Sequence, residues 1–255
     1  MEKIFKALVI FLALCMIAPI VVIFVISFGG DGYLRFPPRS LSFQWYQQLF
    51  GDRLWLRAFA TSAIIATISC IITTTAGFMA AYVFSRRQFP GKEWLLAIVL
   101  LPMIVPNVII AIALYFLSAR AGLVGNIVWL ALCHAMLAIP IVVIILLTTM
   151  RGLDHRLEWA AYSVGAGTWS TLRMIVIPLA LPGIISSILF SFLASFDELI
   201  VSLFLVGVGT QTLPVRIWTS LLLNLEPIIA AVSVVLILLT IAILSLDTVV
   251  KRFSR

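Results

Sequence analysis

Six long apolar runs constrain this chain more than any other feature of its sequence. A transmembrane helix needs about 20 mostly apolar residues, and every run reaches this length without the alternation expected of a barrel strand. The sequence therefore predicts an all-α, polytopic membrane helix bundle with six transmembrane helices, organised as one domain over residues 1–255. The runs cover residues 7–28, 58–84, 94–119, 126–150, 175–208 and 227–246.

Composition argues against a soluble domain and against nucleic-acid binding. Charged residues make up 11% of the chain, whereas a soluble globular domain carries about 25%. The formal net charge is +7, but Lys and Arg fall in short clusters between the apolar runs, as the positive-inside rule produces. We therefore expect membrane lipid, not nucleic acid, around the chain. The first run is longer than the roughly 7–15 residues of a signal-peptide core, so we expect it to be a retained span.

The basic residues also predict the orientation. With the amino terminus inside, the inner loops and ends carry eleven Lys and Arg residues and the outer loops carry six. This excess and the even number of spans predict that both termini are cytoplasmic. The loop 29–57 is then external, with a short interfacial helix around Trp45 and Tyr46, and residues 151–174 form a cytoplasmic loop.

The 151–174 loop carries helical periodicity. Gly165 and Gly167 can adopt positive φ and turn the chain, and Thr168 can cap a second short helix. The pattern predicts a helix, a glycine turn and a second helix along the membrane surface, and it leaves open whether they rest in lipid or dock onto a protein. The two apolar stripes are Leu157, Ala160, Ala161 and Val164, then Trp169, Leu172 and Val176.

The stretch EWAAYSVGAGTWSTLRMIVIP, which starts at Glu158, resembles the EAA motif of ABC-importer permeases. The resemblance implies that this segment is a coupling helix that docks into a groove of a separate ATPase subunit. The positions that match at the motif spacing are Ala160, Ala161, Gly165, Ile177 and Pro178. The residues implied to contact the ATPase are Glu158, Trp159, Ala160, Ala161, Gly165, Ala166 and Gly167.

Two positions depart from the motif. Trp159 stands where the motif has Glu, with Glu158 one residue earlier, and Ile177 replaces the usual Leu before the proline. It is therefore open whether Glu158 takes over an ion pair that the motif Glu would make.

The resemblance extends over nearly the whole chain. The FPP segment of the first external loop, and SFDELIVSLFLVG followed by TLPVRIW after the fifth span, look like permeases of the spermidine/putrescine type. Such a resemblance implies a bacterial inner-membrane permease that works with two ATPase subunits, a second sister permease and a periplasmic substrate-binding protein. The implied substrate is a polyamine or a related small cationic amine. The alternatives are another small solute (amino-acid-like, phosphonate or metal) or a stand-alone secondary transporter.

Two acids interrupt the fifth apolar run. A charge at mid-bilayer costs about 2.5–3.5 kcal/mol on insertion scales, so Asp197 and Glu198 predict a break that lines a cavity. Adjacent helix positions point about 100° apart, so we expect one acid, Asp197 by preference, to face a substrate pathway. A cationic substrate or an internal partner such as Arg216 would explain the acids equally well.

The remaining polar positions in the spans predict structure, not chemistry. His134 is expected to pack or hydrogen-bond between helices. Pro102, Pro106 and Asn107 either curve the third span or break it at the pathway. The chain has no P-loop, nucleophile-elbow or zincin motif, so we expect no nucleotide site, no metal site, no cofactor and no enzymatic activity.

Overall fold

The computed structural model describes residues 2–223 and 226–253, with side chains described up to residue 245. The described residues form helices and loops, and the single β-bridge among them joins Gly29 and Leu41. The all-α prediction is confirmed. The single domain expected over 1–255 includes residues 1, 224–225 and 254–255, which lie outside the described part.

The helices follow one another along the whole described chain. They are α1 (Glu2–Ser27), α2 (Gln44–Gly51), α3 (Arg53–Arg86), α4 (Lys92–Leu100), the 3-10 turn Leu101–Met103, α5 (Asn107–Ala121), α6 (Ile127–Gly152), α7 (Arg156–Ser163), α8 (Thr168–Thr171), the π turn Leu172–Val176, α9 (Ile177–Phe196), α10 (Ile200–Leu205), α11 (Leu213–Leu223) and α12 (Ile228–Phe253).

Five helices in the described residues are long and apolar enough to cross a membrane. The span count rises to six if the pair formed by Lys92–Met103 and Asn107–Ala121 is taken as one broken span. The six expected spans therefore each have a counterpart. The five continuous ones are Glu2–Ser27, Arg53–Arg86, Ile127–Gly152, Thr168–Phe196 and Ile228–Ser245.

The third apolar run is broken, not curved. The two helices of the pair meet at 93°, and Pro102 lies in the 3-10 turn between them. Pro106 directly precedes α5. Proline has no backbone N–H, which is tolerated at a helix start because an N–H there has no partner within the helix. The prolines left curvature and a break as alternatives, and the structure shows a break.

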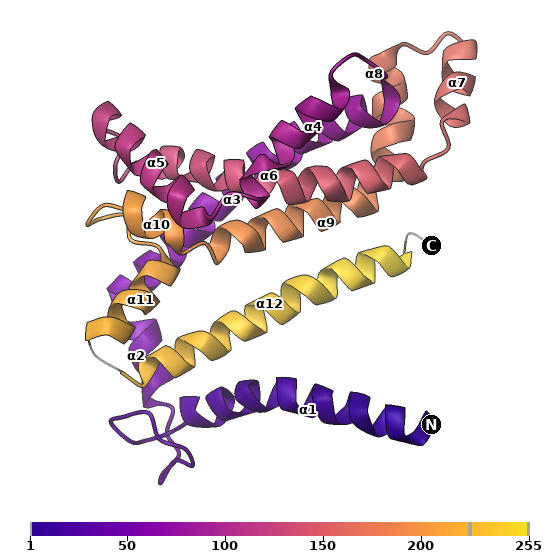
Figure 1. The fold of residues 1–255 in the computed structure, drawn as a ribbon. Coiled ribbons are helices and arrows are strands. Elements are labelled where there is room, and N and C mark those ends of the chain that lie inside the picture. The colour runs from indigo at the N-terminus through magenta and orange to yellow at the C-terminus, as the bar shows by residue number, and fades with distance from the viewer. Residues whose placement is uncertain (1, 224–225, 254–255) are drawn as a thin grey trace. The chain divides into compact units, whose positions relative to one another are not determined.

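Two groups of segments pack separately. One comprises the chain up to Arg57 with Arg216–Ala242, and the other comprises Ala58–Val215 with the end of the chain from Ile243. In the second group, α6 packs along α9, while α10 packs on α5. Figure 1 shows α7 and α8 at one end of the α6–α9 pair and α5 with α10 near its other end.

Small residues allow α6 and α9 to approach closely. Lipid tails are as apolar as Leu, so membrane helices gain little from the hydrophobic effect and depend on close van der Waals packing. Gly183 of α9 faces Thr149 of α6, and buried Ser186 and Ser187 follow it on α9. The neighbouring core contains Val142, Val143, Leu146, Met150, Val176 and Ala180.

The loop between α1 and α3 folds on itself in the first group. The expected short helix is present as α2, and its Trp45 donates a hydrogen bond from Nε1 to the Gly29 carbonyl at 2.7 Å. The Tyr46 hydroxyl lies 2.7 Å from the Ser27 hydroxyl. These bonds tie α2 to the end of α1, so both aromatic residues have partners inside the chain.

Substitution of Gly183 by Ala should destabilise the α6–α9 contact. A Cβ at position 183 would overlap the side chain of Thr149, a stiff β-branched residue whose hydroxyl donates to the Ile145 carbonyl at 2.9 Å. We expect a loss of about 1–3 kcal/mol from overpacking, seen as a lower thermal unfolding temperature in detergent. Gly152→Ala is the matched control, because a Cβ there meets nothing within 4 Å. Equal stabilities of the two variants would contradict the close approach.

Candidate functional site

The loop between α6 and α9 has the predicted helix–turn–helix form. α7 ends at Ser163, and Gly165 turns the chain with φ +85°, a conformation that glycine adopts at no steric cost. Gly167, also expected to allow positive φ, instead has φ −73° and ψ 164° and precedes α8 as its capping residue. Thr168 is therefore the first residue of α8 and not its cap, which corrects the sequence-based expectation.

The loop presents an apolar outer surface. Trp159, Val164 and Trp169 are 61%, 84% and 71% exposed. A hollow of about 430 Å³ lies between α7 and the start of the next span. Among its lining residues are Leu157, Ala160, Ala161, Val164, Ala166 and Met174.

Glu158 points the other way, into the chain. It is 2% exposed, and its Oε1 lies 2.6 Å from Nε of Arg86 at the end of α3. Tyr82 donates its hydroxyl to Oε2 at 3.3 Å, and Arg86 donates from Nη1 to the Met150 carbonyl at 3.0 Å. Of the seven residues expected to contact an ATPase, Glu158 is thus the one whose side chain is buried, while the other six are exposed or half-buried.

Sequence reasoning missed Arg86 and Tyr82 as partners of this loop. A signal existed, because Tyr82 and Arg86 stand four residues apart and so share one face at the end of an apolar helix. What the sequence does not give is the acid that they meet, since Glu158 follows 72 residues later.

The structure separates the two acids of the fifth run. α9 ends at Phe196, and Glu198 turns inward at the start of α10, where its carboxylate accepts hydrogen bonds at 3.1 Å each from the N–H groups of Ile200, Val201 and Ser202. Glu198 therefore satisfies three backbone donors at the break that the sequence predicted.

Asp197 is exposed and accepts no hydrogen bond from the described residues. The expected break at these acids is present, and Asp197 is the acid whose carboxylate has no hydrogen-bond donor among the described residues. Arg216, the alternative internal partner considered for the acids, has its guanidinium carbon 5.3 Å from the Trp55 ring centroid, a cation–π contact.

His134 of α6 belongs to the same break. It is 2% exposed, and its Nδ1 lies 2.9 Å from Oγ and 3.1 Å from the carbonyl of Ser195. Its Nε2 lies 3.1 Å from Oγ of Ser202 and 3.7 Å from Oε2 of Glu198. His134 thus joins α6 to both sides of the break by hydrogen bonds, as expected for a polar residue between membrane helices.

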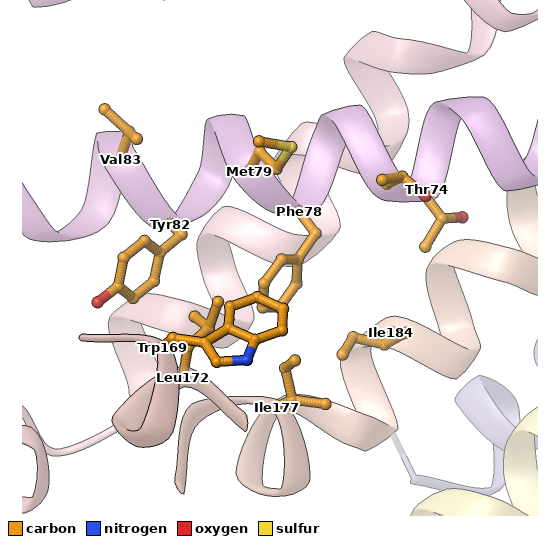
Figure 2. A pocket seen from close by; sticks show the side chains of 10 residues that line it. Thr74, Phe78, Met79, Tyr82, Val83, Trp169, Leu172, Ile177 and Ile184 are labelled. Carbon is orange, nitrogen blue, oxygen red and sulfur yellow. The ribbon is translucent and has the colours of Figure 1, made fainter. Parts of the chain in front are cut away.

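An apolar cleft of about 560 Å³ separates α3 from α8 and the start of α9. Figure 2 shows Phe78 and Tyr82 of α3 on one side and Trp169 with Leu172 on the other. Beyond α8 the chain continues as a π turn, Leu172–Val176, a rare conformation that is frequent at functional sites.

Comparisons with known proteins agree on one family. The sequence profile of the binding-protein-dependent transport system inner membrane component matches residues 73–255. The chain is 30% identical over 234 residues to the spermidine/putrescine transport system permease protein PotC of Haemophilus influenzae, covering 92% of this chain and 91% of that protein. It is 32% identical over 196 residues to a probable molybdenum ABC transporter permease protein of Haloferax volcanii, covering 74% and 72%.

The fold matches solved transporter structures as well. A crystal structure of a bacterial ABC transporter involved in the import of the acidic polysaccharide alginate matches with a TM-score of 0.75. The match covers 99% of this chain and 95% of that chain at 17% identity, so it bears on the fold alone.

Removal of Glu198 should lower the stability of the chain more than removal of Asp197. Glu198→Ala leaves three N–H groups of α10 without their acceptor, and each buried unsatisfied donor costs about 1–3 kcal/mol, so we expect a clear drop in the thermal unfolding temperature in detergent. Asp197→Ala is the matched control, and its unfolding temperature should stay close to that of the unchanged chain. A larger drop for Asp197→Ala would contradict the assignment of the two acids.

Proposed function

The chain belongs to the family of binding-protein-dependent transport system inner membrane components, and we propose that it imports a polyamine or a related small cationic amine. It is a multi-pass inner-membrane permease subunit of an ABC importer and not an enzyme. In this proposal it forms half of the translocation pathway. The observation that carries the coupling mechanism is the helix–turn–helix of residues 156–171 with its exposed apolar surface.

In this proposal a separate ATPase subunit supplies the energy, since the chain's own sequence has no P-loop. The docking surface in this proposal is the outer side of α7 and the glycine turn, formed by Trp159, Ala160, Ala161, Gly165, Ala166 and Gly167. Small side chains allow a partner to approach closely, and the hollow beside them offers a recess for a side chain of the ATPase. Closure of the ATPase subunits on ATP would then displace α7 and α8 and switch the bundle between inward and outward openings.

The complete importer in this proposal contains two ATPase subunits, a sister permease and a periplasmic substrate-binding protein. The family description supports a binding protein. The proposal puts both termini and the 151–174 loop in the cytoplasm, on the side of the ATPase, because the positive-inside rule assigns the more basic loops to that side.

Two observations support a cationic substrate. The relative from Haemophilus influenzae carries spermidine/putrescine transport in its name, and Asp197 is an exposed carboxylate without a hydrogen-bond donor in the described chain. The similarly identical relative named for molybdenum supports the alternative of another small solute. The charge of Asp197 favours the cationic amine, because a carboxylate in the pathway attracts a cation and repels an anion.

Arginine at the docking surface should uncouple the importer. Ala160→Arg or Ala161→Arg places a long charged side chain where the ATPase must approach, and disrupted interface hot spots typically cost about 2 kcal/mol or more. We expect uptake by the assembled importer to fall about tenfold or more relative to ATP hydrolysis. Gln88→Arg, an exposed change in the α3–α4 turn, is the control and should transport normally. Undiminished uptake by both alanine variants would contradict the docking surface.

Neutralising Asp197 should weaken transport of a cation. A hydrogen bond to a charged group is worth about 1.5–3 kcal/mol, so Asp197→Asn should raise the KM for spermidine or putrescine uptake about tenfold or more without loss of the assembled complex. Glu93→Gln removes another exposed acid, on α4, and should leave KM unchanged. Equal KM values for the two variants would remove Asp197 from the pathway.

A further inference from the structure

The ion pair between Arg86 and Glu158 joins the proposed docking helix to the membrane-spanning part of the chain. Both side chains are nine-tenths or more buried, although they lie at the loop end of the bundle. We propose that this pair is the link through which a displacement of α7 is transmitted to α3 and α6. Arg86 is then a positioning residue of the coupling mechanism. The inference rests on the proposed function, because it assumes that α7 is moved by an ATPase.

Arg86 connects three helices at one point. Its Nε binds the Glu158 carboxylate of α7 at 2.6 Å, and its Nη1 binds the Met150 carbonyl of α6 at 3.0 Å. Tyr82, one turn earlier on α3, donates to the other oxygen of the same carboxylate at 3.3 Å. α7 is thus held to α3 through both carboxylate oxygens, and α3 to the last turn of α6.

The pair is not explained by stability alone. Taking two charges out of water costs free energy that their attraction repays only in good geometry, and apolar residues of similar size often do as well or better. Here Nη2 of Arg86 is buried without a hydrogen-bond partner among the described residues. A buried pair that leaves a donor unsatisfied fits a role in fixing the position of α7 better than a role in raising stability.

The other half of the loop is attached differently. α8 and the π turn face α3 across the apolar cleft, where Trp169 and Leu172 lie opposite Phe78 and Tyr82 (Figure 2). The same Tyr82 therefore lines the cleft with its ring and binds Glu158 with its hydroxyl. α7 is therefore the part of the loop that is bonded to α3, through Glu158, whereas α8 is separated from α3 by the cleft.

The ion pair uses the acid next to Trp159. The only acid of α7 is Glu158, and its carboxylate is paired with Arg86. The docking surface of α7 accordingly presents an exposed tryptophan where the EAA motif has glutamate, and it has no carboxylate for a basic residue of the ATPase.

The experiment uses the complete importer, with its ATPase, sister permease and binding protein, in proteoliposomes. ATP hydrolysis and substrate uptake are measured together for the unchanged chain and for Glu158→Gln, Arg86→Gln and the double variant. We expect uptake per ATP hydrolysed to fall about fivefold or more in each single variant, the lower end of typical coupling between two sites, while hydrolysis continues. The double variant should lose no more than either single one, because all three break one link.

Arg87→Gln is the matched control, because Arg87 is the exposed neighbour of Arg86, and it should keep the normal ratio. A merely structural role would lower the yield of assembled complex without changing uptake per ATP. If Arg86→Gln does not assemble, Glu158→Gln, which keeps the side-chain size, supplies the measurement. A normal ratio in Glu158→Gln, or additive losses in the double variant, would overturn the inference. Failure of the unchanged chain to associate with the ATPase would instead overturn the proposed function.

Discussion

Hydrocarbon offers no hydrogen-bond partners, and the helix starts at Glu198 and Asn126 reflect that constraint. A backbone group that loses its helical partner in the membrane must find another inside the protein. At the end of α9 the Glu198 carboxylate supplies the acceptor for three N–H groups of α10. At the start of α6 the Asn126 side chain accepts from the N–H of Trp129. The polar residues at these two helix ends thus serve the fold, whereas Asp197, which accepts no hydrogen bond from the described residues, is the acid that we propose for contact with the substrate.

An internal ion pair organises the loop that we propose as the coupling element. A carboxylate at the edge of the bundle could face water at little cost, yet Glu158 is buried against Arg86 and Tyr82. Glu158 is buried, and the next residue, Trp159, is exposed on the outer side of α7. Neighbouring residues of one short helix therefore have different roles. Glu158 attaches α7 to the bundle, and Trp159 faces outward on the proposed docking surface.

The sequence predicted the features that depend on local pattern. Run length predicted the spans, and helical spacing with Gly165 predicted the helix–turn–helix of the loop. Pro102 and Pro106 marked the third run, but their positions alone did not distinguish curvature from a 93° break, because that depends on how α5 packs. The roles of Asp197 and Glu198 were not separable either, since they depend on where α10 begins. The Arg86–Glu158 pair joins residues 72 positions apart, and local pattern carries no information on such a contact.

Uptake by purified protein in proteoliposomes tests the central claim most directly, because it separates an ATP-driven permease from a transporter that works alone. Liposomes containing this chain without an ATPase subunit should take up no labelled spermidine or putrescine above the protein-free background. Liposomes containing the chain with its ATPase, sister permease and binding protein should accumulate the label only when ATP is supplied on the ATPase side. Uptake by the chain alone, without ATP, would contradict the account of an ABC importer permease.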